Sequence, residues 1–236
     1  KKIGAYCLII FFIFQTILLH KRNLLYRSNI LLWEDALQKS PGKLRALHNL
    51  SHLYIAEKNY AKAFTILRAL TQSQVSSHYR SYAHNNLGSI YLQLGDYLKA
   101  EKEFKSGIRA KSSQPTNHFN LGTLLASQGR NLAAKESYEK AEGLYKNYRW
   151  GYQVPAELYI NKARLLLKLK LYKEAEVSIN NYLKRVPESG PGHFVLASIF
   201  SAIGKQDKAL HEYSLIGNTP KLKGEVHNNR ALIFIK

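Results

Sequence analysis

The chain has 236 residues, of which 45% are hydrophobic and 11% aromatic, so it is long enough and apolar enough to bury a sizeable core. Lys and Arg total 35 against 16 Asp and Glu, a formal net charge of +19 that favours acidic proteins, anionic lipid head groups or nucleic acid as partners. The basic residues are scattered along the chain, so a generally basic solvated surface is the simpler interpretation. Cys7 is the only cysteine, which excludes a disulfide within the chain.

The first feature along the chain is an uncharged apolar run at residues 3–19, IGAYCLIIFFIFQTILL. As a helix it would span about 25 Å, which is enough for a slightly thinned hydrocarbon core of a bilayer. Two lysines precede the run and a His-Lys-Arg triplet follows it, so basic side chains at both ends can reach the head groups. We therefore predict a transmembrane helix with basic flanks at residues 1–20, and the lipid bilayer as a partner.

Two alternatives for the apolar run stay open. A cleaved signal peptide is disfavoured because the run is long and no small-x-small cleavage site follows it. A buried helix of a globular domain would have no use for the basic flanks.

The side of the membrane on which the rest of the chain lies is not decided by charge. Six basic residues between positions 21 and 45 outnumber the two before the apolar run, which alone favours the cytoplasm. The chain has no methionine, even at position 1, so we expect residues upstream of Lys1 in the native protein, and these would change the count.

Residues 21–43 are predicted to form a juxtamembrane capping helix, roughly from Leu24 to Lys39. Trp33, Ala36 and Pro41 have the spacing of a second helix in the repeat described next, without a preceding first helix. This half repeat should cap the array and connect it to the membrane segment.

From residue 44 to residue 236 the sequence repeats itself with a period of 34 residues. Gly88 and Gly122 are 34 residues apart, as are Ala100 and Ala134. In the clearest copy Leu87-Gly88 is followed by Tyr91, and Ala100 by Phe104. This pattern of Leu-Gly-x-x-Tyr in a first helix and Ala-x-x-x-Phe in a second resembles the tetratricopeptide repeat (TPR).

The resemblance implies an all-α fold, a right-handed TPR superhelix (an α-solenoid) in which each helical hairpin buries its apolar face against the next. Small residues at the repeated positions allow paired helices to approach closely, and aromatic residues fill the space between hairpins. The fourth copy is weaker because Lys162 occupies a position where leucine is usual. We predict the first helix of a sixth repeat at residues 225–236 and expect further repeats, or a partner, to cover it. Five full repeats are predicted to begin near Leu44, Ser81, Pro115, Ala156 and Gly190.

Two junctions between repeats are longer than the period. The first has three extra residues near Ser73 to His78, and the second has seven in the stretch 145–155. The second insertion is rich in aromatic residues, which either form a second contact surface for a partner or the membrane edge, or plug a wide gap between repeats. Its members are Tyr145, Tyr148, Arg149, Trp150 and Tyr152.

The resemblance also implies that the first helices line a concave groove. The sixth position of each repeat carries an amide in all copies but the fifth, where Val195 interrupts the series. An asparagine amide donates and accepts hydrogen bonds at once, so it can hold the backbone of an extended peptide without reading its side chains, and the series resembles the asparagine ladder of O-GlcNAc transferase. The series consists of Asn49, Asn86, Asn120, Asn161 and Asn229.

Other groove positions add basic and aromatic side chains that favour an acidic or carboxylate-bearing segment. They match the carboxylate clamp of chaperone-binding TPRs only in part. These residues are Arg45, His48, His52, Tyr82, Asn85, Arg164 and Lys168.

The sequence carries no motif for catalysis or for a cofactor. His48 and His52 are four residues apart on one helix, a spacing that can bind zinc, but the zincin glutamate and a third ligand are absent. No phosphate-binding loop, nucleophile elbow or paired carboxylates appear, and the base-stacking motifs of RNA-binding domains are missing. We therefore predict no enzyme activity, no metal and no cofactor for this chain, and do not expect nucleic acid as a partner.

The residues that join the apolar run to the repeats carry a second resemblance. Arg22-Asn23, Leu32 to Asp35, Lys39 to Pro41 and Arg45 to Leu50 are similar to the junction between the last membrane helix and the TPRs in membrane glycosyltransferase-like proteins related to the transmembrane-and-TPR O-mannosyltransferases. That resemblance implies a catalytic part upstream and TPRs on the periplasmic or luminal side.

Two functions follow as expectations. The first is a membrane-anchored TPR scaffold that binds a protein or extended peptide and supports assembly of a membrane complex. The second is the substrate-recruiting TPR region of a multi-spanning membrane glycosyltransferase.

Overall fold

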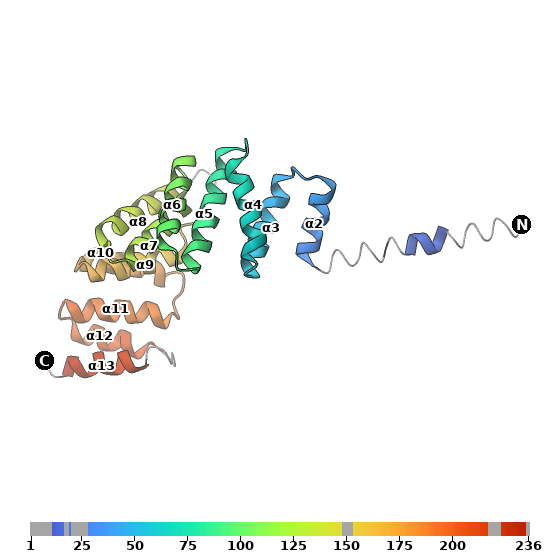
Figure 1. The fold of residues 1–236 in the computed structure, drawn as a ribbon. Helices are drawn as coiled ribbons and strands as arrows, with labels where there is room; N and C mark the ends of the chain where they lie inside the picture. The colour runs from blue at the N-terminus through green and yellow to red at the C-terminus, as the bar shows by residue number, and fades with distance from the viewer. Residues whose placement is uncertain (1–10, 17–18, 20–27, 148–152, 217–222, 235–236) are drawn as a thin grey trace, which may run out of the picture.

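The computed structural model describes residues 11–16, 19, 28–147, 153–216 and 223–234. Within this part of the chain all regular secondary structure is helical, and helices α2 to α13 stack in chain order into a curved array (Figure 1). The helices are α2 (Asn29–Lys39), α3 (Leu44–Ala56), α4 (Tyr60–Gln72), α5 (Ser77–Gln93), α6 (Tyr97–Ala110), α7 (Pro115–Ser127), α8 (Asn131–Lys146), α9 (Ala156–Lys168), α10 (Tyr172–Leu183), α11 (Gly190–Ala202), α12 (Gln206–Ser214) and α13 (Lys223–Phe234).

Each repeat is an antiparallel helical hairpin with a tight turn. Every turn contains one residue with positive φ, a conformation that glycine adopts without strain and that ends the first helix. Asp96 directly follows one of these glycines, and its carboxylate accepts a hydrogen bond from the backbone N–H of Lys99, capping the second helix. The positive-φ residues are Lys58 (57°), Gly95 (79°), Gly129 (75°), Lys170 (59°) and Gly204 (76°).

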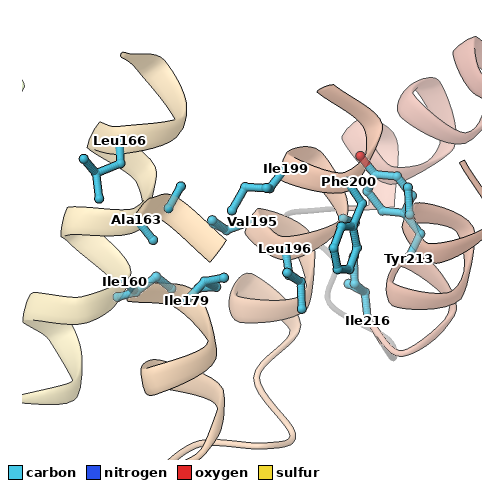
Figure 2. Close-up of a cluster of buried hydrophobic side chains, with 13 residues drawn as sticks. Ile160, Ala163, Leu166, Ile179, Val195, Leu196, Ile199, Phe200, Tyr213 and Ile216 are labelled. Atoms are coloured by element: carbon cyan, nitrogen blue, oxygen red, sulfur yellow. The ribbon is translucent and has the colours of Figure 1, made fainter. Parts of the chain in front are cut away.

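The core is a row of apolar clusters between successive hairpins. At the close approaches between helices the small residues are fully buried, including Ala100, Ala134, Ala163 and Ala197. In the fourth and fifth repeats the row continues through Ile160, Leu166, Ile179, Val195 and Phe200 to Tyr213 (Figure 2). Each cluster combines residues of more than one hairpin, so stability depends on the neighbouring repeats.

The first helices are closer to one another than the second helices are. Each first helix from α3 to α11 contacts the next first helix, whereas no second helix contacts the next second helix within the described part of the chain. A stack held together more tightly on one side curves toward that side, so the first helices line the concave face.

Two helices differ in length from what the sequence predicts. The capping helix was expected from Leu24, but α2 is described only from Asn29, with Ser28 as its N-cap, and residues 20–27 lie outside the described residues. At the first long junction Ser73 to Ser76 connect α4 to α5, and only Ser77 and His78 are helical. Helix α5 thus begins at Ser77, one turn before the predicted start at Ser81, because helix continues upstream when no proline or glycine stops it.

The predicted membrane segment at residues 3–19 is described only at residues 11–16 and 19, which are helical. Among the described helices, none is both long enough and apolar enough to cross a bilayer.

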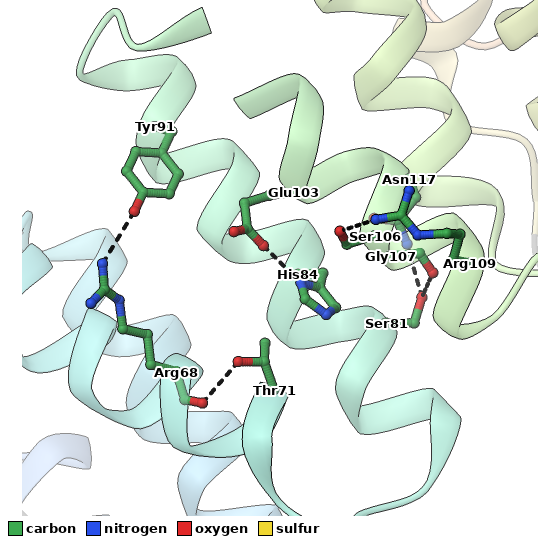
Figure 3. Close-up of polar contacts among 10 residues, drawn as sticks. All are labelled: Arg68, Thr71, Ser81, His84, Tyr91, Glu103, Ser106, Gly107, Arg109 and Asn117. Carbon is green, nitrogen blue, oxygen red and sulfur yellow. Dashed lines mark hydrogen bonds and ion pairs between the residues drawn. The ribbon is translucent and has the colours of Figure 1, made fainter. Parts of the chain in front are cut away.

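Polar contacts also connect helices within and between repeats (Figure 3). Ser81 donates a hydrogen bond to the carbonyl of Gly107 and accepts one from Asn117 Nδ2, each at 2.9 Å, and both side chains are fully buried. Nδ1 of His84 lies 2.7 Å from Glu103 Oε2. His193 occupies the same repeat position as His84, and its Nδ1 lies 2.7 Å from Glu212 Oε2.

A half-buried ion-pair group explains the unusual lysine of the fourth repeat. Lys162 Nζ lies 2.7 Å from Glu142 Oε2, and the side chains of both residues are 13% exposed. Lys146 Nζ lies 2.5 Å from the other oxygen of Glu142. Burial by itself would raise the pKa of Glu142, but the hydrogen bonds and charges of the two lysines hold that pKa below its usual value.

We expect Glu142→Gln to lower the free energy of unfolding by about 1–3 kcal/mol at neutral pH, because it leaves Lys162 without its buried partner. Adding Lys162→Leu should recover most of this loss, since no unpaired charge is then buried. Because folding lowers the pKa of Glu142, its contribution is present above the usual glutamate pKa and is lost as pH falls through the lowered value.

Urea unfolding of the single and double variants between neutral and acidic pH measures these changes. Glu188→Gln, at an exposed position, is the control. A Glu142→Gln variant as stable as wild type at neutral pH would show that the ion pair does not stabilise the fold.

Candidate peptide-binding groove

The predicted groove residues lie on first helices, along the concave side of the array. Asn49 is on α3, Asn120 on α7 and Asn161 on α9, and all three are partly exposed. Asn120 donates a hydrogen bond from Nδ2 to Asn85 Oδ1 at 2.8 Å, which joins α7 to α5. The amides of Asn49 and Asn161 form no hydrogen bond with any other described residue, so both are available to a ligand.

Asn86 differs from the expectation that the amide series faces solvent when the groove is empty. It is only 9% exposed, and its Nδ2 is enclosed without a hydrogen-bond partner among the described residues. Helix α5 contacts α3 and α7 among the first helices, and α4 and α6 as well, so it lies inside the packed array. We therefore treat Asn86 as part of the packing between first helices.

An aromatic cluster occupies the N-terminal part of the groove. The His48 ring stacks on the Tyr82 ring with centroids 3.9 Å apart, and the Tyr82 hydroxyl donates to the His48 carbonyl. Burial, followed by the charges of His52 and His78, lowers the pKa of His48, so its imidazole is neutral at pH 7. The described residues contain no group of three or more His, Cys, Asp or Glu side chains that could hold a metal ion.

Two hollows form the C-terminal part of the groove, and Arg164 and Lys168 of α9 line both of them. The hollow toward α7 has a volume of about 370 Å³ and is also lined by Thr123, Ser127 and Asn161. The hollow toward α11 has a volume of about 470 Å³. Its wall is mostly apolar, and it is formed by Leu167, Phe194, Val195, Ser198 and Glu225.

The remaining predicted groove residues lie at the edges of this face. Arg45 and His52 are exposed on α3, and Asn229 is partly exposed on α13. Along successive first helices the structure therefore places stacked His48 and Tyr82 on α3 and α5, and the cations Arg164 and Lys168 on α9, with amides on α3, α5, α7 and α9.

The aromatic insertion is only partly described. For Tyr145 the sequence left open a contact with a partner or the filling of a gap between repeats, and the structure places it in α8 with 7% exposure. It packs with Val154, Leu158 and Tyr159 across the junction, because α8 extends to Lys146 and carries the ring into the gap between repeats. Tyr145 is therefore a packing residue. The other four members, Tyr148, Arg149, Trp150 and Tyr152, lie outside the described residues.

Several residues that line the two hollows were not among those predicted from the sequence. Thr123 and Ser127 line one hollow from α7, and Leu167, Phe194 and Ser198 line the other from α9 and α11. The TPR resemblance implies that the fifth, ninth, twelfth and thirteenth positions of each repeat face the groove, and these residues occupy those positions. Their residue types gave no signal, since small polar and apolar side chains are common throughout helices.

An array of stacked helical hairpins with a groove along its first helices is the architecture of a helical-repeat binding protein. The tetratricopeptide repeat profile matches residues 44–74, 81–114, 115–148 and 156–187, which is more than half of the chain. The chain therefore belongs to the tetratricopeptide repeat family. The matches begin at the residues where the periodicity places the first four repeats.

Relatives with assigned names share the repeats over most of this chain. It is 25% identical over 183 residues to anaphase-promoting complex subunit 3 of Schizosaccharomyces pombe, covering 78% of this chain and 26% of that protein. It is 26% identical over 182 residues to protein O-mannosyl-transferase TMTC3 of Homo sapiens, covering 72% of this chain and 19% of that protein. The chain thus spans about a quarter or less of these relatives.

Solved structures share the fold. The Cut9–Hcn1 hetero-tetramer of the anaphase-promoting complex matches with a TM-score of 0.67 at 16% identity, over 85% of this chain and 38% of that chain. YrrB, described as a TPR protein with an unusual peptide-binding site, matches with a TM-score of 0.61 at 15% identity, over 86% of this chain and 96% of that chain. MamA from Desulfovibrio magneticus RS-1 matches with a TM-score of 0.58 at 17% identity, over 66% of this chain and 84% of that chain.

Proposed function

We propose that this chain is a membrane-anchored TPR scaffold that holds an extended, acidic segment of a partner protein in its concave groove and so supports assembly of a membrane complex. The TPR fold supports a role in protein–protein interaction, and the named proteins include a subunit of a complex and a TPR protein with a peptide-binding site. One observation carries the proposal: Asn49 and Asn161 present unbonded amides from the same repeat position on the concave side. Amides so placed match the donors and acceptors of an extended backbone.

The groove is tested by Asn49→Ala combined with Asn161→Ala. Each lost backbone hydrogen bond should weaken binding by about 0.5–1.5 kcal/mol, so the pair should cost about 1–3 kcal/mol if the effects add. Folding should be unchanged, because neither side chain is buried. Peptides selected by the wild-type protein from a displayed library of random linear peptides provide the ligands, and fluorescence anisotropy measures their affinity.

Asn180→Ala, an exposed amide on α10, is the matched control and should leave affinity unchanged. If the Asn49/Asn161 variant binds the selected peptides as tightly as wild type does, the groove is not the binding surface. The aromatic insertion at residues 148–152 then becomes the next surface to test.

Anchoring is tested by deleting residues 1–20. The shortened protein should leave the membrane fraction at moderate salt, because the basic surface alone is screened there. Sedimentation with membranes after a high-salt wash would contradict the role of residues 3–19.

A second candidate function is the substrate-recruiting TPR region of a multi-spanning membrane glycosyltransferase. The similarity to TMTC3 favours it, together with the junction residues from Arg22 to Leu50. In that case the catalytic groups lie in membrane helices upstream, and the chain itself supplies only the groove. An intact mass of the native protein that leaves room for many membrane spans before Lys1 would support this candidate over the single-span scaffold.

A further inference from the structure

The two hollows beside α9 differ in chemistry although they share one wall. On the α7 side the lining combines the polar side chains of Thr123, Ser127 and Asn161 with apolar ones such as Ala126 and Leu165. On the α11 side Leu167, Phe194 and Val195 supply an apolar wall beside Ser198 and Glu225. Val195 is the residue that interrupts the amide series, and it is buried at 3% exposure in the core cluster below the groove. The change from amide to valine therefore marks a change in what the groove can bind.

The wall between the hollows carries two free cations. Arg164 and Lys168 are both exposed, one helical turn apart, and neither takes part in an ion pair among the described residues. In contrast, most acidic residues on the neighbouring helices are already paired, including Glu139 and Glu174 with Lys135. A ligand carboxylate would therefore meet two donors that no carboxylate of the described chain satisfies.

Glu225 determines on which side of α9 an acidic group of the ligand is expected. Its exposed side chain lines the apolar hollow from α13, at the end away from α7. A ligand carboxylate in that hollow would meet like charge, whereas one on the α7 side of the wall would not. The acidic group is therefore expected on the polar side, and an apolar side chain is expected in the hollow of about 470 Å³.

We propose that the groove at α7, α9 and α11 is a composite subsite that selects an acidic and an apolar side chain two residues apart in an extended peptide. This rests on the proposed function and specifies its ligand. Side chains two residues apart lie on the same face of an extended chain, about 7 Å from each other. The two hollows share Arg164 and Lys168 in their lining, so they are neighbours on either side of α9 and one short segment can reach both.

The partner segment is assigned to the interior of its chain rather than to a C-terminus. The groove does not end at the apolar hollow, because α13 continues the row of first helices beyond α11 and carries Asn229 at the amide position. A ligand can therefore extend past the subsite in both directions. The carboxylate comes from an Asp or Glu side chain.

Selection from a displayed random peptide library tests the subsite. The wild-type protein should enrich peptides with Asp or Glu two positions from Leu, Ile, Phe or Val. In fluorescence anisotropy on the best synthetic peptide, changing its acidic residue to the amide should weaken binding by about 10- to 100-fold, and so should the protein variant Arg164→Gln/Lys168→Gln. The peptide with a C-terminal amide should bind as well as the free acid.

The control is Lys173→Gln/Lys184→Gln, which removes the same charge from exposed positions on or directly after α10, the second helix of the same repeat. It should change affinity by less than about 3-fold. Three results would each overturn the proposal. The selected peptides could lack the acidic and apolar pair, both protein variants could lose the same amount of affinity, or binding could require the free C-terminal carboxylate. If the selected peptides lose affinity with Asn49→Ala/Asn161→Ala but not with Arg164→Gln/Lys168→Gln, the groove function stands and the subsite does not. If neither variant changes the affinity for the selected peptides, both the groove function and the subsite are wrong.

Discussion

Replacing Ala100 by arginine is expected to unfold the middle of the array. Ala100 is fully buried in a cluster with Phe104, Leu121 and Leu124, at the close approach of α5 and α6. An arginine there overpacks the contact and buries a charge without a partner, which together should lower the free energy of unfolding by more than about 4 kcal/mol. Urea unfolding followed by circular dichroism measures the loss.

Leu98→Arg is the matched control for this substitution. Leu98 lies on the same helix and is 82% exposed, so arginine there should change stability by less than about 0.5 kcal/mol. Equal stability of Ala100→Arg and wild type would show that the register of the repeats is wrong.

The second large effect is expected at Gly107, where α6 meets α7. A Cβ at this position would lie 2.2 Å from Asn117 Oδ1 and 2.6 Å from Asn117 Cγ. Asn117 is fully buried and held by its hydrogen bond to Ser81, so it has no free space to move into. Gly107→Ala should therefore destabilise the fold by about 2–4 kcal/mol, although alanine is the better helix former.

Removing the obstructing side chain should reverse the sign of this effect. In an Asn117→Ala background, Gly107→Ala should be neutral or stabilise by up to about 1 kcal/mol, because only the helix propensity remains. Gly143→Ala is the control: Gly143 is also helical, but its Cβ would meet no atom within 4 Å, so this change should stabilise slightly. A loss for Gly107→Ala that persists without the Asn117 side chain would contradict the proposed contact.

The sequence was sufficient to predict the fold of the repeat array, because each structural position occurs once in every repeat and can be compared among the copies. The period of 34 residues placed the small residues at the helix approaches, and Ala100, Ala134, Ala163 and Ala197 are all fully buried. The periodicity could not show which residues meet across a junction. From the sequence, Lys162 only weakened the match of the fourth repeat to the pattern, whereas the structure shows that it pairs with Glu142. The two are 20 residues apart, a separation set by the long α8 and the insertion after it.

The groove was predictable only in outline. Repeat positions identified which helix faces carry Asn49, Asn161, Arg164 and Lys168, since a face follows from helical periodicity. They could not show that Asn86 is enclosed, because its burial depends on how the neighbouring helices pack around α5. They also could not show the two hollows, which require side chains from three successive first helices at once.

Photo-crosslinking in native membranes tests most directly whether the concave groove holds an extended partner. A photoreactive amino acid is placed at Asn161 or Ser198 in the groove, and at Lys102 or Val177 on exposed positions of the second helices. The groove positions are predicted to capture one partner, with crosslinks from both falling within one short linear segment of it. Capture of the same partner from the second helices but not from the groove would contradict the account.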